Sequence, residues 1–250
     1  MKNKSEYIKF ILPLLIIFFW FIFTYTGKVP PTSLPSLSAV KDTFIEMLKS
    51  GQLSNDLSLS LRRVLAGFFI SSVLGISLGI FMGISPKAKE FFQLSLTAIR
   101  QTPMIAWIPL IILWAGIGEV SKIVVILFAA TFPIVVNTMG GVDSTSETYL
   151  EVAKMYGLSK KDTFFKVYLP SALPNIFTGL RLGLGASWMA VVASELIASS
   201  SGIGYRLNDA RSLMRSDVVI VCMTIIGLVG LLMDKLIVLI SHELTPWKKN

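Results

Sequence analysis

The sequence has 250 residues, of which 53% are hydrophobic and only 15% charged, and its mean hydropathy is +0.70. Soluble domains carry about 25% charged residues, so this composition excludes a water-soluble protein and indicates an integral membrane protein. The formal charge of +8 is spread among short loops, which argues against a nucleic-acid partner. Cys222 and His242 are the only residues of their types, so we expect no disulfide framework and no metal site.

Apolar runs determine the predicted architecture. A hydrocarbon core of about 30 Å needs roughly 20 apolar residues per helix. Such runs lie near 10–26, 59–84, 93–115, 121–138, 174–197 and 217–240. The sequence therefore predicts an all-α polytopic membrane protein with six transmembrane helices. Its parts are an N-terminal span plus an external amphipathic segment (1–57), a membrane domain (58–240) and a tail (241–250).

The N-terminal run has a basic start, "MKNKSEYIKF", and an apolar core, as a signal peptide would. No small-residue cleavage site follows, since the chain continues "TYTGKVPP", so we predict a retained span. Lys2, Lys4 and Lys9 favour a cytoplasmic N-terminus, and an even number of spans returns the C-terminus to the cytoplasm. The predicted location is the plasma membrane.

Two surface patterns predict packing. Between the first two spans, an apolar face predicts a short helix on the outer membrane surface; its members are Val40, Phe44, Met47 and Leu48. Small residues recur every four positions in the second span, at Gly67, Ser71, Gly75, Gly79 and Gly83, and again in the fifth, at Gly179, Gly183 and Ser187. Such stripes let helix backbones approach closely in lipid.

A charged stretch, "EVAKMYGLSKKDTFFKVYLPSALP", interrupts the apolar sequence at 151–174. Ser144 and Glu147 form an S-x-x-E pattern, which predicts a helix start at Ser144. One face of this helix is apolar, with Tyr149, Val152, Ala153 and Tyr156. At about 1.5 Å per residue the helix is roughly 18 Å long, too short to cross a membrane.

A glycine turn and a second short helix follow. Gly157 is free to take positive φ and should end the first helix. Ser159 with Asp162 repeats a capping pattern, and Pro170 is expected to end the second helix. The predicted unit is a helix, a glycine turn and a helix, tied between the fourth and fifth spans.

This unit resembles the EAA loop of permease subunits in binding-protein-dependent ABC importers. The resemblance rests on E-x-A-x-x-x-G, nine residues and V-x-L-P, formed by Glu151, Ala153, Gly157, Val167, Leu169 and Pro170. Val152 departs from the usual alanine. The segments "SLRRVLAGF", "RQTPMIAWIPLIILW", "GIGE", "FPIVVNT", "GLRLGLGASW" and "SSGIGY" extend the similarity from about 58 to 240. Together they look like the subfamily that imports aliphatic sulfonates, taurine or nitrate.

The resemblance implies the transmembrane fold of a type I ABC importer working as a homodimer. Partners would be two cytoplasmic ATPase subunits, membrane lipid, and an extracytoplasmic substrate-binding protein touching loops near 27–57 and 199–216. The EAA loop, about 139–173, would seat in the ATPase. Its coupling residues would be Glu151, Ala153, Lys154, Met155, Tyr156, Gly157, Leu158, Ser159 and Pro170. The chain has no G-x-x-x-x-G-K-[ST], so we expect no enzyme activity or cofactor in it, with ATP and magnesium on the ATPase.

Ionisable groups within spans require a partner or a cavity, which makes them candidates for the translocation path. The candidate path residues are Arg100, Gln101, Thr102, Trp107, Arg181, Trp188 and Glu195. Structural pairing explains Arg100 equally well. Arg181 and Glu195 share one helix face about 21 Å apart, so they cannot pair. Asp234 and Lys235, near the inner end of the last span, are expected to pair with each other or to snorkel.

Two other classes compete. A DNA-binding helix-turn-helix needs polar side chains for base edges, which Phe164 and Phe165 do not supply. An ion-coupled secondary transporter would use intramembrane charges as a relay, often within inverted repeats. We find no repeat between the two halves, and such a transporter leaves the hairpin unexplained. No nucleophile and base stand together, so no catalytic residues are predicted.

Overall fold

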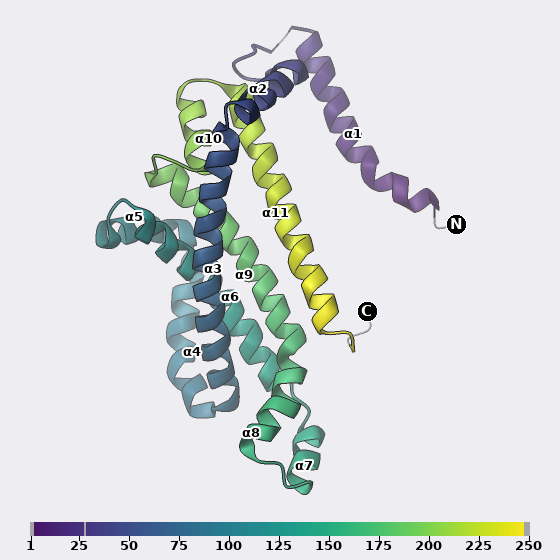
Figure 1. The fold of residues 1–250 in the computed structure, drawn as a ribbon, viewed down its shortest axis with the longest axis vertical. Coiled ribbons are helices and arrows are strands. Elements are labelled where there is room, and N and C mark those ends of the chain that lie inside the picture. Colours follow the sequence, from purple (N-terminus) through teal and green to yellow (C-terminus); the bar gives the residue numbers. More distant parts are fainter. Residues whose placement is uncertain (1–2, 28, 248–250) are drawn as a thin grey trace.

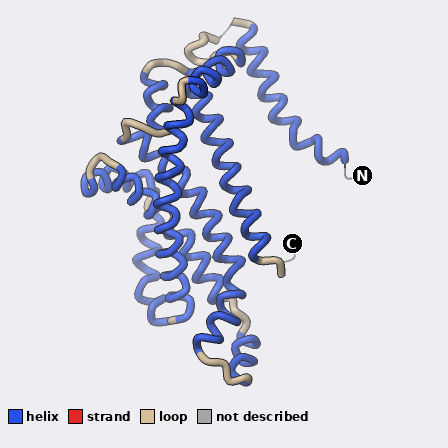
Figure 2. Tube along the Cα trace, viewed as in Figure 1, coloured by secondary structure: helices blue, strands red, loops and turns tan. Residues whose placement is uncertain are grey.

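The computed structural model describes residues 3–27 and 29–247, with side chains from Ile11 onward. Lys2 and the side chains of Lys4 and Lys9, used above to orient the chain, lie outside the described residues. Within the described part the regular elements are all helical, which confirms the all-α prediction (Figures 1 and 2). They are α1 (Asn3–Tyr25), α2 (Leu37–Lys49), α3 (Gln52–Ile84), α4 (Pro86–Gln101), α5 (Met104–Ala115), α6 (Glu119–Asp143), α7 (Glu147–Met155), α8 (Lys160–Thr163), the π-helical turn η1 (Phe164–Tyr168), α9 (Leu169–Ala198), α10 (Ile203–Ser212) and α11 (Ser216–Leu244).

Four helical stretches of the described residues are long and apolar enough to cross a membrane, namely α3, α6, the continuous rod 160–198 and α11. The bent pair of α4 and α5 makes a fifth if it counts as one span. In α1 the apolar part lies over Ile11–Tyr25 and is shorter than the others. The number six therefore stays a prediction.

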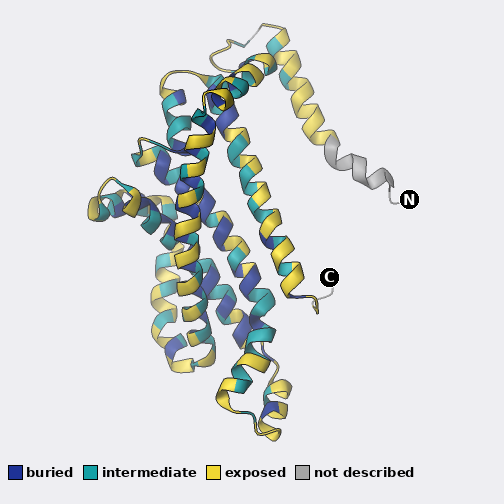
Figure 3. Cartoon of the chain, viewed as in Figure 1, coloured by how far each residue is buried: buried dark blue, intermediate teal, exposed yellow. Residues whose placement is uncertain are grey.

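The small-residue stripes pack closely against a neighbouring helix, as predicted, and for both stripes that helix is α6. A Cβ atom placed on Gly75 would lie 2.7 Å from Ile134 Cγ2, and one on Gly183 would lie 2.8 Å from Ile134 Cγ1. Ile134 is thus held between a glycine of α3 and a glycine of α9. The three helices form the centre of the bundle, where most buried residues lie (Figure 3).

The predicted third span, 93–115, is not one helix. It consists of the end of α4 and the whole of α5, bent by 99° at Thr102 and Pro103. Pro103 has no N–H to continue the hydrogen-bond ladder, and it forces the preceding Thr102 into an extended conformation (ψ 123°). As a result α5 projects to one side of the bundle (Figure 1).

The N-terminal elements lie at one end of the molecule. The predicted amphipathic helix is α2, which packs against the N-terminal end of α11 through Val40, Phe44 and Met47. Leu48 was expected on the same face and is exposed. The reason is that Leu48 is one residue, about 100°, beyond the buried Met47. Helix α1 runs away from the bundle, with Trp20 Nε1 donating to the Pro35 carbonyl at 2.9 Å (Figures 1 and 3).

Candidate functional site: a coupling hairpin and intramembrane ion pairs

The hairpin begins later than the capping pattern indicated. Helix α6 continues to Asp143, and Ser144 is its C-cap, with Ser144 Oγ donating to the Gly141 carbonyl at 2.9 Å. Helix α7 starts at Glu147, after Ser146. The predicted start at Ser144 is wrong, because the hydroxyl that would cap α7 is already bonded to the preceding helix. The first helix is therefore only nine residues long.

The turn at Gly157 agrees with the prediction. Gly157 has φ of +68°. Its N–H donates to the Lys154 carbonyl at 3.0 Å, and the N–H of Leu158 donates to the Ala153 carbonyl at 3.0 Å. This pair of bonds is the Schellman motif, which satisfies the last carbonyls of a helix. The next cap is also confirmed, since Ser159 Oγ accepts from the Asp162 N–H at 3.1 Å.

Pro170 does not end the second helix. Four residues of α8 lead into η1 and then directly into α9, so the chain is helical from Lys160 to Ala198. At the junction the N–H of Leu169 bonds to the Phe164 carbonyl, five residues back. In this wider turn the hydrogen-bond ladder skips one position, and Pro170 lies in the first turn of α9, where proline is tolerated.

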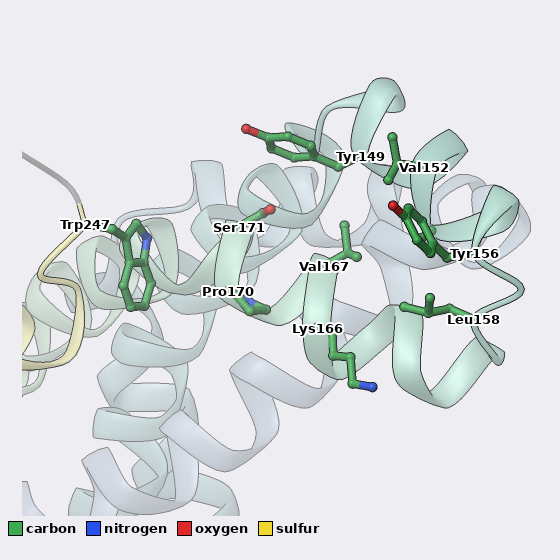
Figure 4. Close-up of a pocket in the computed structure, with 10 residues that line it drawn as sticks. Tyr149, Val152, Tyr156, Leu158, Lys166, Val167, Pro170, Ser171 and Trp247 are labelled. Atoms are coloured by element: carbon green, nitrogen blue, oxygen red, sulfur yellow. The ribbon is translucent and has the colours of Figure 1, made fainter.

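The apolar face of α7 is mostly uncovered. Ala153 is buried, whereas Tyr149 is 62% and Tyr156 81% exposed. The face borders a cavity of about 600 Å³ between α7 and the start of α9. Val167 and Pro170 line its other wall, and Trp247 reaches it from the C-terminal segment (Figure 4). Met155, Glu151 and Lys154 are also exposed. An exposed apolar patch of this kind, rimmed by charges, is typical of an interaction surface.

A buried ionic network occupies the opposite end of the bundle. Glu195 of α9 is 1% exposed. Its carboxylate accepts from Arg63 Nη1 at 2.6 Å, from Ser60 Oγ at 2.8 Å and from the Gly204 N–H at 2.9 Å. Arg63 also donates from Nε and Nη2 to Glu119, at 2.7 and 2.5 Å. Arg63 thus joins α3, α9 and the start of α6. Glu195, predicted in the path, is enclosed inside the chain.

The segment "SSGIGY" folds over this carboxylate. A Cβ atom on Gly202 would lie 2.4 Å from Glu195 Cδ, and Gly202 has φ of +104°. Its N–H donates to Asp56 Oδ1 at 3.1 Å, and Arg206 Nε donates to Asp56 Oδ2 at 2.9 Å. Only glycine fits at a position with both this backbone conformation and this contact.

Sequence reasoning missed Arg63, which it included only within the segment "SLRRVLAGF" and not among the candidate site residues. A signal was available. Ser60 and Arg63 precede Gly67 at spacings of seven and four residues, so they continue the buried stripe of the same helix. The spacing identifies the face, although it does not identify Glu195 as the partner.

The other predicted path residues fall in separate places. Arg100 is exposed on the last turn of α4, with Gln101 and Thr102 at the bend. Arg100 lines a cavity of about 150 Å³ between α4 and α6. Trp107 is partly buried against Phe128, with ring centroids 5.5 Å apart. This group belongs to the bend and to α5, and none of its members is a hydrogen-bond partner of Glu195.

Trp188 and Arg181 lie at the seam between α9 and α11. Trp188 is buried, and its Nε1 donates to the Ile226 carbonyl at 3.0 Å. Arg181 pairs with Asp234, with Nε to Oδ1 at 2.6 Å and Nη2 to Oδ2 at 2.7 Å. We expected Asp234 to pair with Lys235 or to snorkel. This expectation is wrong, because Arg181 on the neighbouring helix donates to the Asp234 carboxylate from both Nε and Nη2. Arg181 and Glu195 do not pair, as predicted.

Comparison with known proteins shows the family. Residues 71–245 match the model of the binding-protein-dependent transport system inner membrane component. This chain is a member of that family. Its relatives include a putative ABC transporter permease of Methanocaldococcus jannaschii, 37% identical and covering 99% of this chain and 94% of the relative. The family assignment does not favour the secondary-transporter alternative.

Two further relatives are named for their transport systems. The putative aliphatic sulfonates transport permease SsuC of Bacillus subtilis is 37% identical, over 96% of this chain and 87% of the relative. The taurine transport system permease TauC of Escherichia coli is 32% identical, over 94% and 87%. Among solved structures, an amino acid ABC transporter crystallised with histidines gives a TM-score of 0.66 at 16% identity, covering 80% of this chain and 98% of that one. The fold is therefore that of ABC importer permeases.

Proposed function

We propose that this permease forms the path for a small anion and couples its passage to a separate ATPase through the hairpin 139–173. The observation that carries the coupling role is the exposed apolar face of α7 on a rigid, capped hairpin at one end of the bundle. The predicted orientation puts this end in the cytoplasm, where a soluble partner is available. The chain itself is a transport subunit and not an enzyme.

The contacts expected with the ATPase follow from the exposed side chains. Tyr149, Met155 and Tyr156 are the apolar anchors, and full burial of such a side chain stabilises an interface by about 1.5 to 3 kcal/mol. Glu151 and Lys154 are exposed beside them, and their charges fix how the hairpin is aligned with oppositely charged groups of the ATPase. Because α8, η1 and α9 form one rod, a displacement of the hairpin moves α9 as a rigid body.

The coupling role is tested with Gly157→Val and Glu151→Lys. A Cβ atom at Gly157 meets nothing within 4 Å, so valine there introduces only the strain of positive φ, about 1 to 2 kcal/mol. Gly116→Val is the matched control, because Gly116 lies outside the hairpin, has a similar positive φ of +77°, and is also exposed with open surroundings. In the purified complex we expect both test variants to lose ATPase subunits or substrate-stimulated hydrolysis, and the control to retain them. Full retention and normal uptake in both test variants would exclude the hairpin as the coupling element.

For the substrate we propose an aliphatic sulfonate or taurine ahead of nitrate. The support is similarity to permeases named for sulfonates and for taurine. The proposed assembly is a permease homodimer with two ATPase subunits and an extracytoplasmic binding protein, which contacts the surface near 27–57 and 199–216. Deletion of the gene should abolish growth on taurine or an alkanesulfonate as sole sulfur source. Unchanged growth on both, with loss of growth on nitrate as nitrogen source, would reverse the order.

A further inference from the structure

The Arg181–Asp234 pair is unusual because it is open. The side chains are 52% and 44% exposed, although both lie within helices long enough to cross a membrane. Asp234 is ten residues before the end of α11, about 15 Å along the helix axis. The Arg63–Glu195 pair, by contrast, is enclosed by the chain. Charged groups at this depth are strongly disfavoured against lipid, so the open side of the Arg181–Asp234 pair faces water or protein.

A polar cavity adjoins the pair. It has a volume of about 190 Å³ and is lined by Arg181 and Thr178 of α9 and by Ser241, His242 and Thr245 at the end of α11 and just beyond it. Drug-sized ligands occupy at least about 300 Å³, so this cavity suits a smaller ligand. The end of α11, which lines it, points toward the end of the molecule that carries the hairpin (Figure 1). In the predicted orientation this is the cytoplasmic half.

The guanidinium retains capacity for a second acceptor. Asp234 accepts from Nε and Nη2 of Arg181, and no acceptor among the described residues bonds to Nη1. A guanidinium presents five N–H donors in a planar fork that matches an oxyanion. Lys235, one residue after Asp234, is exposed and adds positive charge beside the seam. The pair itself is neutral, so the attraction for an anion comes from the unused Nη1 donors and, from the adjacent helix face, from Lys235.

From these contacts we infer that the seam between α9 and α11 is an oxyanion site in the cytoplasmic half of the translocation path. Arg181 is the binding group, and Asp234 is a positioning residue that fixes the guanidinium and limits how long an anion stays. The inference rests on the proposed anion import and adds a site to it. The shared ligand chemistry is a sulfonate or phosphate group, supplied either by the transported anion or by a lipid headgroup.

Exposure to water is tested with single cysteines in the full permease complex. The only native cysteine, the buried Cys222, is replaced by serine. Thr178→Cys reports on the cavity, and Leu236→Cys is the control, since Leu236 is 59% exposed on another face of α11. In nanodiscs, a charged, membrane-impermeant thiol reagent should modify Thr178→Cys at least tenfold faster than Leu236→Cys. Equal rates would overturn the inference.

Anion binding is tested by protection of the same cysteine. In zwitterionic lipid, millimolar ethanesulfonate should slow modification of Thr178→Cys several-fold. Adding Arg181→Gln should abolish this protection, Asp234→Asn should strengthen it and slow turnover, and the neighbouring Lys235→Gln should reduce it only partly. Protection that survives Arg181→Gln would overturn the site.

Binding of a lipid headgroup at the seam is tested separately, by replacing the zwitterionic lipid with anionic lipid in the same protection assay. Protection by anionic lipid without any protection by ethanesulfonate or nitrate would make the seam a headgroup site and overturn its place in the path. A wrong substrate in the proposed function can be told apart from a wrong site. If the binding protein delivers no sulfonate, but nitrate protects Thr178→Cys through Arg181, the site stands and the proposed substrate is wrong.

Discussion

Arg63 lies between two carboxylates with very different surroundings. Glu195 is enclosed, whereas the side chain of Glu119 is 57% exposed. Removing one member of a buried pair leaves the other charge without compensation, which costs about 3 to 5 kcal/mol. An exposed pair contributes about 1 kcal/mol or less. The two halves of this network therefore differ in strength, and the half with Glu195 determines stability.

We predict that Arg63→Met lowers the stability of the purified permease by about 3 to 5 kcal/mol, because Glu195 is left buried and unpaired. Arg62→Met is the control, since the neighbouring Arg62 is exposed, and should change stability by less than about 0.5 kcal/mol. Glu119→Gln should lie between them. The measurement is the unfolding midpoint in detergent. Equal midpoints for the Arg62 and Arg63 variants would show that the network does not stabilise the fold.

Gly202→Ala is expected to reduce the yield of folded protein severely. The added methyl would meet the Glu195 carboxylate at 2.4 Å and would also sit at a positive φ. Gly118→Ala is the matched control, because Gly118 has an extended backbone and open surroundings. Size-exclusion profiles after purification compare the two. Similar monodisperse yields for both would contradict the close contact over Glu195.

At the scale of elements, the contact of α3, α6 and α9 depends on glycines. Gly75→Val should destabilise the bundle by at least about 1 to 3 kcal/mol, since its Cβ would lie 2.7 Å from Ile134 and the backbones would have to separate. Gly227→Val on α11 meets no atom within 4 Å and serves as the control. Protease resistance in detergent provides the measurement. A Gly75 variant as resistant as the control would show that α3 can move away at little cost.

Most of these elements are predictable from the sequence because their signals are local. The stripe from Gly67 to Gly83 and the turn at Gly157 depend on backbone geometry and helical spacing alone. The errors lie where two local signals compete. Ser144 has the pattern of an N-cap but ends α6 instead, and Pro170 has the pattern of a helix end but follows a π turn. Such outcomes depend on the neighbouring turn, which a four-residue pattern does not contain.

The ion pairs are less predictable than the helices. Arg63 and Glu195 are 132 residues apart, and Arg181 and Asp234 are 53 apart. Spacing identifies which helix face each side chain occupies, but the choice of partner depends on how α3, α9 and α11 pack. Asp234 was therefore assigned to its sequence neighbour Lys235. The predicted path residues fall into two groups, one beside the bend at Pro103 and one, Arg181 and Trp188, at the seam between α9 and α11, with Glu195 apart from both.

At the scale of the whole molecule, α1 is set apart from the bundle. Apart from bonds within the helix and the turn after it, the described residues of α1 make one hydrogen bond, from Trp20 Nε1 to the Pro35 carbonyl. We predict that proteolytic removal of α1 from the folded chain, at a cleavage site introduced between Gly27 and Pro30, leaves the unfolding midpoint in detergent unchanged. Met47→Ala in α2 is the comparison. Met47 is buried, and its truncation should cost about 2 to 5 kcal/mol. A large fall after cleavage would show that α1 stabilises the bundle.

The unbroken rod from Lys160 to Ala198 restricts how this protein can change in length during evolution. Each residue added to a helix rotates everything beyond it by about 100° and advances it by about 1.5 Å. One insertion between Ser159 and Glu195 would turn the hairpin away from its present direction, or carry the carboxylate of Glu195 off Arg63. The loop before α2 has no such register to keep, whereas the short turn after α10 is closed by backbone bonds from Met214 and Arg215 to the end of α10. Insertions and deletions should therefore accumulate in the loop before α2 and be absent from the rod.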